Sequence, residues 1–134
     1  AKAEMKSPTV FDVVEREISL SKNEYKPHHL SKILWSFAKA GVKSPSVFEA
    51  VEKELSLKIN CFNSQDLSNI VWAYAKARII SPTVFDAVEK QILLKINKFN
   101  EDDLSKIVWS YSRIGIEAPV LFLALEQRLL SECQ

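Results

Sequence analysis

Apolar positions recur along this chain at helical spacing. Within residues 67–75, five apolar side chains share one side of an ideal helix at about 100° per residue. They are Leu67, Ile70, Val71, Tyr74 and Ala75. A stripe of this width is typical of a helix that packs along one side and faces water along the other. The pattern therefore predicts amphipathic helices.

The same pattern returns every 37 residues. Three tryptophans share this spacing: Trp35, Trp72 and Trp109. Four of the five prolines share it too: Pro8, Pro45, Pro82 and Pro119. Residues 30–59 and 67–96 are identical at 18 of 30 positions without a gap. Self-similarity at a fixed period indicates a repeat architecture. We predict a half repeat over residues 1–23 and three repeats over residues 24–60, 61–97 and 98–134, all in one solenoid.

Each repeat carries the start signals of two helices. The first helix opens with a side-chain acceptor and an acid three residues later, at Asn63 and Asp66 and again at Asn100 and Asp103, or with a proline at Pro27. The second helix opens with Ser-Pro or Ala-Pro, at residues 7–8, 44–45, 81–82 and 118–119. Short linkers make each pair an antiparallel hairpin, and hairpins of this size bury both apolar faces only by stacking. The predicted fold is all-α, an α-solenoid of about seven helices.

The two ends of the array carry lone second helices. One runs from Pro8 to about Leu20 and the other from Pro119 to about Leu130. Apolar residues of the first of these, such as Phe11 and Val14, need cover. One interpretation is that the chain is a segment of a longer array or a subunit embedded in an assembly. The other is that these residues pack back on the first full repeat, and the sequence leaves both open.

Composition removes several classes of protein. The chain has 134 residues, of which 47% are hydrophobic and 26% charged, so a disordered chain is excluded. Two glycines leave no room for a Gly-rich phosphate loop. No apolar stretch approaches a membrane span, so we expect no direct membrane insertion, and the first residues lack a signal-peptide pattern. The chain reads as soluble.

The reactive side chains do not form a recognisable site. Cys61 and Cys133 are far apart in sequence, and His28 and His29 are the only histidines. These spacings fit neither a disulfide framework nor a zinc site. No Ser/His/Asp set, Cys/His set or carboxylate pair has a catalytic context. We therefore expect no metal, no cofactor and no enzymatic activity.

Charge is distributed according to repeat position. The formal net charge is +1, which gives the chain no strong overall field. Residues 30–43, 67–80 and 104–116, which hold most of each first helix, contain seven cations and no acid, so the remainder carries a net −6. Acids lie at the starts of first helices or along the second helices, as at Glu49, Asp86 and Glu126. Such a basic row favours a polyanion as the ligand.

The polar side of each first helix repeats a triplet of a long polar residue, a small residue and a cation at i, i+4 and i+7. The triplets are Lys32/Ser36/Lys39, Asn69/Ala73/Lys76 and Lys106/Ser110/Arg113. This spacing predicts one exposed stripe along each first helix. The tryptophans lie at its border, where they pack between repeats or stack on a ligand base. Both interpretations stay open.

The unit resembles the organellar heptatricopeptide and octotricopeptide repeats, the helical hairpins found in RNA-binding proteins that often carry a RAP domain. The resemblance rests on Phe62-Asn63, Asp66-Leu67, Trp72-Ala73-Tyr74-Ala75, Pro82 and Phe85 and on the matching residues Phe99-Asn100, Asp103-Leu104, Trp109-Ser110-Tyr111-Ser112, Pro119 and Phe122. It covers nearly the whole chain, and the 37-residue period favours the heptatricopeptide form. We expect no RAP domain in this chain.

This resemblance implies modular binding of single-stranded RNA or rRNA in a mitochondrion or, alternatively, a plastid. Mapped onto the polar stripes, it places Lys39, Lys76 and Arg113 at phosphates. The base-proximal positions are then Lys32, Ser36, Asn69, Ala73, Lys106 and Ser110. The alternative function is a scaffold subunit of a large organellar complex, such as a mitoribosome or a membrane assembly, that does not read RNA itself. Salt-dependent RNA binding by the isolated chain distinguishes the two.

Overall fold

The computed structural model describes residues 12–14, 16–17 and 26–132, and these residues form an all-helical fold without strands. Six α-helices follow one another: α2 (Pro27–Lys39), α3 (Pro45–Lys58), α4 (Ser64–Ala77), α5 (Pro82–Leu94), α6 (Glu101–Ile114) and α7 (Pro119–Glu132). Short 3₁₀ turns, η1 (Ile59–Cys61) and η2 (Ile96–Lys98), follow α3 and α5. The predicted all-α fold is confirmed. Of the helix predicted from Pro8 to about Leu20, residues 12–14 and 16–17 are helical and the rest lies outside the described residues.

The helices begin where the capping residues predict. Asn63 accepts a hydrogen bond from the backbone N–H of Asp66 at 2.7 Å, and the Asp66 carboxylate accepts one from the backbone N–H of Asn63 at 3.1 Å, which makes a reciprocal capping box. Ser44 and Ser81 cap α3 and α5 through their hydroxyl oxygens, each with a proline at the first helical position. The second-helix prolines keep the 37-residue spacing, and the division of the chain at 24–60, 61–97 and 98–134 remains a prediction.

The first helices end at a left-handed residue. Gly41 and Gly115 follow α2 and α6 with φ of 77° and 78°. Arg78 holds the same position after α4 with φ of 59°, a conformation that is costly for a residue with a Cβ atom. The chain therefore places both of its glycines at this turn and leaves one repeat without one.

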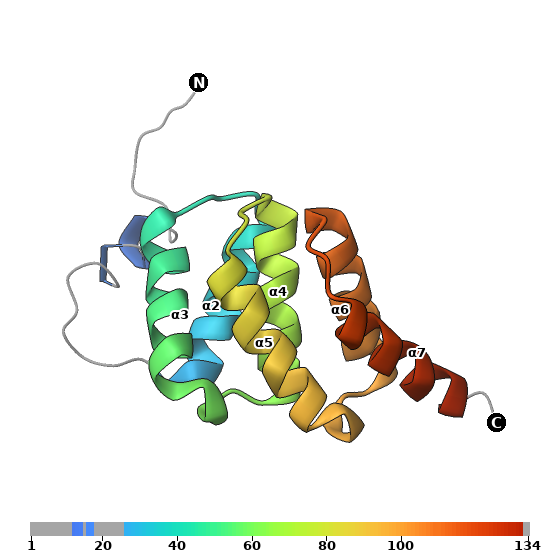
Figure 1. Cartoon of the computed structure of the whole chain (residues 1–134). Coiled ribbons are helices and arrows are strands. Elements are labelled where there is room, and N and C mark those ends of the chain that lie inside the picture. Colours follow the sequence, from blue (N-terminus) through green and yellow to red (C-terminus); the bar gives the residue numbers. More distant parts are fainter. Residues whose placement is uncertain (1–11, 15, 18–25, 133–134) are drawn as a thin grey trace.

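The helices form two layers around one core (Figure 1). The first-helix layer consists of α2, α4 and α6, in which each helix packs extensively on the next. The second-helix layer consists of α3, α5 and α7, which contact one another much less and fan apart from α3 to α7. Leu67, Ile70, Val71, Tyr74 and Ala75 are all buried, so the apolar stripe predicted for α4 is confirmed.

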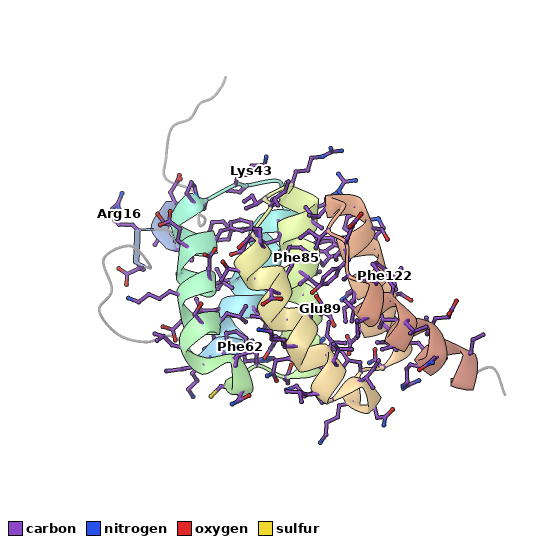
Figure 2. All side chains as sticks on the ribbon, in the orientation of Figure 1. Arg16, Lys43, Phe62, Phe85, Glu89 and Phe122 are labelled. Carbon is purple, nitrogen blue, oxygen red and sulfur yellow. The ribbon has the colours of Figure 1, made fainter. Side chains whose placement is uncertain are left out.

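A zigzag of aromatic rings joins successive hairpins through the core. Tyr74 of α4 donates to the carbonyl oxygen of Phe48 in α3 at 2.7 Å, and Tyr111 of α6 donates to that of Phe85 in α5. The rings of each pair meet edge to face at 4.9 Å. Burial, and then nearby glutamate or aspartate side chains, raise the pKa of both tyrosines, so they act as neutral donors. The zigzag continues to Phe122, which Figure 2 labels on α7.

Candidate nucleic-acid interface

A ladder of indoles crosses the outer face of the first-helix layer. The ring centroids of Trp35 and Trp72 are 6.1 Å apart, and those of Trp72 and Trp109 are 6.3 Å apart, with interplanar angles of 33° and 31°. We call these three residues the tryptophan ladder. Contact between indoles of neighbouring helices confirms that the tryptophans pack between repeats. Trp109, at the end of the ladder, is 40% exposed, and stacking on a base there stays a hypothesis.

Two cations lie against the ends of the ladder. The ammonium of Lys39 is 5.0 Å from the Trp35 ring centroid, and the guanidinium carbon of Arg113 is 5.2 Å from that of Trp109. Arg113 also donates through Nε to the carbonyl oxygen of Ala75 on α4. The side chains of Lys39, Arg113 and Lys76 of α4 are all exposed. Cation–π contact holds a charge in place without removing it from water, so these cations can still meet an anion.

A hollow of about 280 Å³ lies beside the ladder. It is lined by Lys32, Trp35, Ser36, Gln65, Asn69 and Lys106. Lys106 Nζ donates to Asn69 Oδ1 at 3.1 Å, which leaves the amide nitrogen of Asn69 as a donor for a ligand. An aromatic wall, two ammonium groups and two amides suit a nucleobase with its phosphate. The structure thus brings four of the predicted base-proximal residues together.

Two other predicted base-proximal residues are not accessible. Ala73 and Ser110 are 0% exposed, and Asn69 is only 9% exposed, so the prediction of a continuous exposed stripe is wrong at Ala73 and Ser110. Their small side chains are buried in the packed first-helix layer, and Ser110 Oγ donates to the carbonyl oxygen of Lys106. Ser36 holds the same repeat position and is exposed, because α2 is the first helix of its layer in the described part of the chain.

Sequence reasoning missed Gln65. Its place within the cap of α4 gave it a structural explanation, yet it lies four residues before Asn69 and therefore on the same side of the helix. Extending the polar stripe by one turn toward the N-terminus would have found it. In α6 the equivalent residue is the exposed acid Asp102. The repeats therefore do not present the same chemistry at this position.

The cluster of His28, Ser31 and Asp66 is a link between helices. His28 Nδ1 lies 2.9 Å from Asp66 Oδ1, and Ser31 Oγ donates to that same oxygen at 2.8 Å. Both α2 side chains therefore bind one carboxylate oxygen of α4 in parallel, and no proton relay connects serine to histidine. Within the described residues, no group of three or more His, Cys, Asp or Glu side chains could hold a metal ion.

Exposed acids line the second-helix layer, and others lie in the first turn of α6. Glu49, Asp86 and Glu126 are exposed there, and Asp86 pairs with Lys90 at 3.3 Å within α5. Burial, and then the neighbouring Asp86, raise the pKa of Glu89. Both layers carry charges of both signs, since Lys53 and Lys90 are exposed in the second-helix layer and Glu101 and Asp102 in the first-helix layer. No helix in the part of the chain that the structure describes has the length and apolar character needed to cross a membrane.

Comparison with known families corrects the resemblance found in the sequence. The chain matches the family RESC6, RNA-editing substrate-binding complex 6 protein, over residues 1–131. No curated protein matches it. The assignment to heptatricopeptide or octotricopeptide repeats is therefore wrong, and nothing supports a plastid or ribosomal role. The residues on which that assignment rested have structural roles in this fold. The tryptophans form the ladder, the tyrosines donate hydrogen bonds to phenylalanine carbonyl oxygens, and the prolines begin helices. With 131 of its 134 residues matched, the chain belongs to the RESC6 family.

Proposed function

We propose that this chain is an RNA-binding subunit of an RNA-editing complex and that it holds single-stranded RNA along the outer face of the first-helix layer. The observation that carries the proposal is the tryptophan ladder with Lys39 and Arg113 against its ends and the hollow beside it. The family description, which names an RNA-editing substrate-binding complex, gives the chemical class of the ligand.

The charges of this face support a polyanionic ligand. Lys39, Lys76 and Arg113 are exposed at one position per repeat, and Lys32 and Lys106 face the hollow. A polyanion gains from such a row because binding releases its condensed counterions. Glu49, Asp86 and Glu126, which are exposed on the second-helix layer, make that layer a less favourable surface for the same ligand. We assign Lys39, Lys76 and Arg113 to phosphates, and Lys32, Ser36, Asn69 and Lys106 to a nucleotide in the hollow.

The proposal includes binding without catalysis and a mitochondrial location. The shared use of Asp66 Oδ1 by His28 and Ser31 supports the absence of catalysis, since this polar cluster holds α2 against α4. The family match is compatible with the mitochondrion. It also makes protein partners part of the proposal, because the family is named for a complex.

The test is the binding of fluorescein-labelled oligouridine and oligoadenosine by the full chain, followed by anisotropy across a salt series. The triple change of Lys39, Lys76 and Arg113 to Ala should weaken binding and reduce the slope of log K against log salt by about 2, as expected for three phosphate contacts on a single strand. The slope is the informative quantity because a change in base contacts leaves it nearly unaltered.

The matched control changes three exposed cations outside this face, Lys53, Lys90 and Lys98, to Ala. Both triple variants lose three positive charges and therefore have the same net charge as each other. A loss of RNA affinity confined to the first variant then locates the binding site. Equal losses in both variants, or no RNA affinity in the parent chain at moderate salt, would contradict the proposal. The latter result would favour the scaffold alternative.

A further inference from the structure

The hollow beside the tryptophan ladder draws its lining from three helices. Lys32 comes from α2, Asn69 from α4 and Lys106 from α6, and all three hold the same repeat position. The volume of about 280 Å³ lies just below the roughly 300–1,000 Å³ of small-molecule sites, so the hollow suits a single base. A neutral asparagine between two lysines gives this place a hydrogen-bonding chemistry of its own.

Lys106 fixes the orientation of the Asn69 amide. Its ammonium group can only donate, so Asn69 Oδ1, at 3.1 Å from Nζ, is the atom that faces it. The amide nitrogen of Asn69 therefore lies on the other side of the amide and carries two N–H donors. Asn69 is 9% exposed, which restricts rotation of its side chain. The hollow thus contains a neutral donor whose direction is set by a neighbouring helix.

Donors dominate the lining of the hollow. The ammonium groups of Lys32 and Lys106 and the amide nitrogen of Asn69 donate and cannot accept, and Asn69 Oδ1 is already bonded to Lys106. The other acceptors belong to Gln65 and Ser36, whose side chains are exposed and can turn to present a donor instead. A ligand therefore gains most in this hollow when its polar edge carries acceptors.

We propose that the hollow selects a base with a carbonyl oxygen where the competing base has an amino group, which means uracil over cytosine or guanine over adenine. O4 of uracil and O6 of guanine accept hydrogen bonds, whereas the amino groups of cytosine and adenine donate them. An amino group against the two ammonium groups and the Asn69 amide nitrogen leaves donors facing donors, and their hydrogen bonds stay unmade. This inference rests on the proposed function and adds to it the class of base that the RNA presents.

The preference belongs to one place in the array. One repeat later, the residues that match Ser36 and Gln65 are Ala73, which is buried, and Asp102, which is an exposed acid. An ionised carboxylate only accepts hydrogen bonds, so it suits an amino group rather than a carbonyl oxygen. We therefore expect selection at one nucleotide of a bound strand and not at every repeat.

The experiment compares the affinities of the full chain for fluorescein-labelled oligomers of equal length at one salt concentration and neutral pH. Oligouridine is paired with oligocytidine, and an alternating adenosine–inosine strand with oligoadenosine, because inosine carries O6 where adenosine carries an amino group. We expect about fivefold tighter binding of the carbonyl-bearing strand in at least one pair, since one hydrogen bond is gained. A preference confined to the first pair assigns the hollow to uracil, and one confined to the second pair assigns it to guanine.

Two variants of the hollow separate base selection from the properties of the free strands. Asn69→Asp replaces the amide donors by an acceptor of the same shape, so the preference should vanish or reverse. Lys32→Met removes an ammonium group at an exposed position, where folding does not depend on it, so the preference should decrease. Stacking within the free strands is the same in every titration, so a change in the ratio of the two affinities reports on the hollow.

The control is the triple change of Lys39, Lys76 and Arg113 to Ala, which should weaken binding of both strands of a pair equally and leave their ratio unchanged. Salt-dependent binding with equal affinities within both pairs would overturn base selection and leave the proposed function standing. A preference that persists in both Asn69→Asp and Lys32→Met would show that selection occurs outside the hollow, which also overturns the inference. Absence of binding to any strand would overturn the inference together with the proposed function.

Discussion

The two layers of this molecule are built from the same repeat but are packed differently. In the first-helix layer, α2, α4 and α6 lie in extensive contact, with residues as small as Ala73 and Ser110 fully buried. In the second-helix layer, α3, α5 and α7 make few contacts with one another, and some of these are polar, such as Ser81 Oγ to Glu52 at 3.2 Å. The first-helix layer therefore fixes the register of the array.

The same difference decides where a ligand surface can form. The ladder and the hollow need side chains from neighbouring first helices at fixed separation, such as Lys106 on α6 and Asn69 on α4. The second helices fan apart, so their outward side chains are not held in a comparable row (Figure 1). Close packing and the candidate interface are consequently two properties of one layer, and a change that disturbs the first should disturb the second.

The largest expected effect comes from enlarging the small residue between α2 and α4. Ala73→Leu adds three carbons at a position with no exposed surface, so we expect the free energy of unfolding to fall by about 1–3 kcal/mol. RNA affinity should fall in parallel, because the ladder on the outer face depends on the same separation of helices. Urea unfolding and the anisotropy titration measure the two quantities.

Matched changes sharpen this comparison of the layers. Ala73→Ser should cost less than about 1 kcal/mol, because Ser110 already occupies the equivalent position and bonds the carbonyl oxygen of Lys106. Ala87→Leu, at a half-buried position of α5, should also be mild. If Ala87→Leu proved as damaging as Ala73→Leu, the first-helix layer would have no special role in setting the register.

Much of this arrangement can be predicted from the sequence, for identifiable reasons. Caps and prolines act locally, so the starts of α3 at Pro45 and α4 after Asn63 follow from a few residues. Burial of Ala73 could not be predicted in that way, because a helical wheel shows which residues share a side and not which side meets a neighbour. The place of a helix in the array also changes burial in a way that the wheel does not show. Ser36 is exposed and Ser110 is buried, although both hold the same repeat position. Such differences arise only when helices are stacked.

A smaller effect is expected at the end of α4. Arg78 adopts the left-handed conformation that Gly41 and Gly115 hold after α2 and α6. Arg78→Gly should raise the free energy of unfolding by about 0.5–1 kcal/mol, because glycine removes the clash of the Cβ atom in that conformation. Thermal and urea unfolding of the variant provide the measurement.

The control for this prediction separates conformation from charge. Arg78→Ala removes the same cation but keeps the Cβ atom, so it should not stabilise the chain. Gly115→Ala should lower the free energy of unfolding by about 1 kcal/mol, and since an added Cβ there meets nothing within 4 Å, the loss would be conformational. Equal stabilisation by Arg78→Gly and Arg78→Ala would point to repulsion between Arg78 and neighbouring cations instead.

The smallest expected effect concerns Asp103, the acid at the start of α6. Burial is the largest influence on its pKa and raises it from the ordinary 3.8, although the hydrogen bond from the backbone of Asn100 acts in the opposite direction. A raised pKa in the folded state means that ionisation of this carboxyl costs stability as pH rises from about 4 through the folded value. The change Asp103→Asn should therefore be neutral near pH 3 and stabilising at pH 7. Glu89→Gln in the second-helix layer should follow the same direction more weakly, because solvent screens its half-buried carboxyl. Urea unfolding of the parent chain and both variants at the two pH values decides the matter, and a loss of stability in Asp103→Asn at pH 7 would show that the cap outweighs burial at this end of the layer.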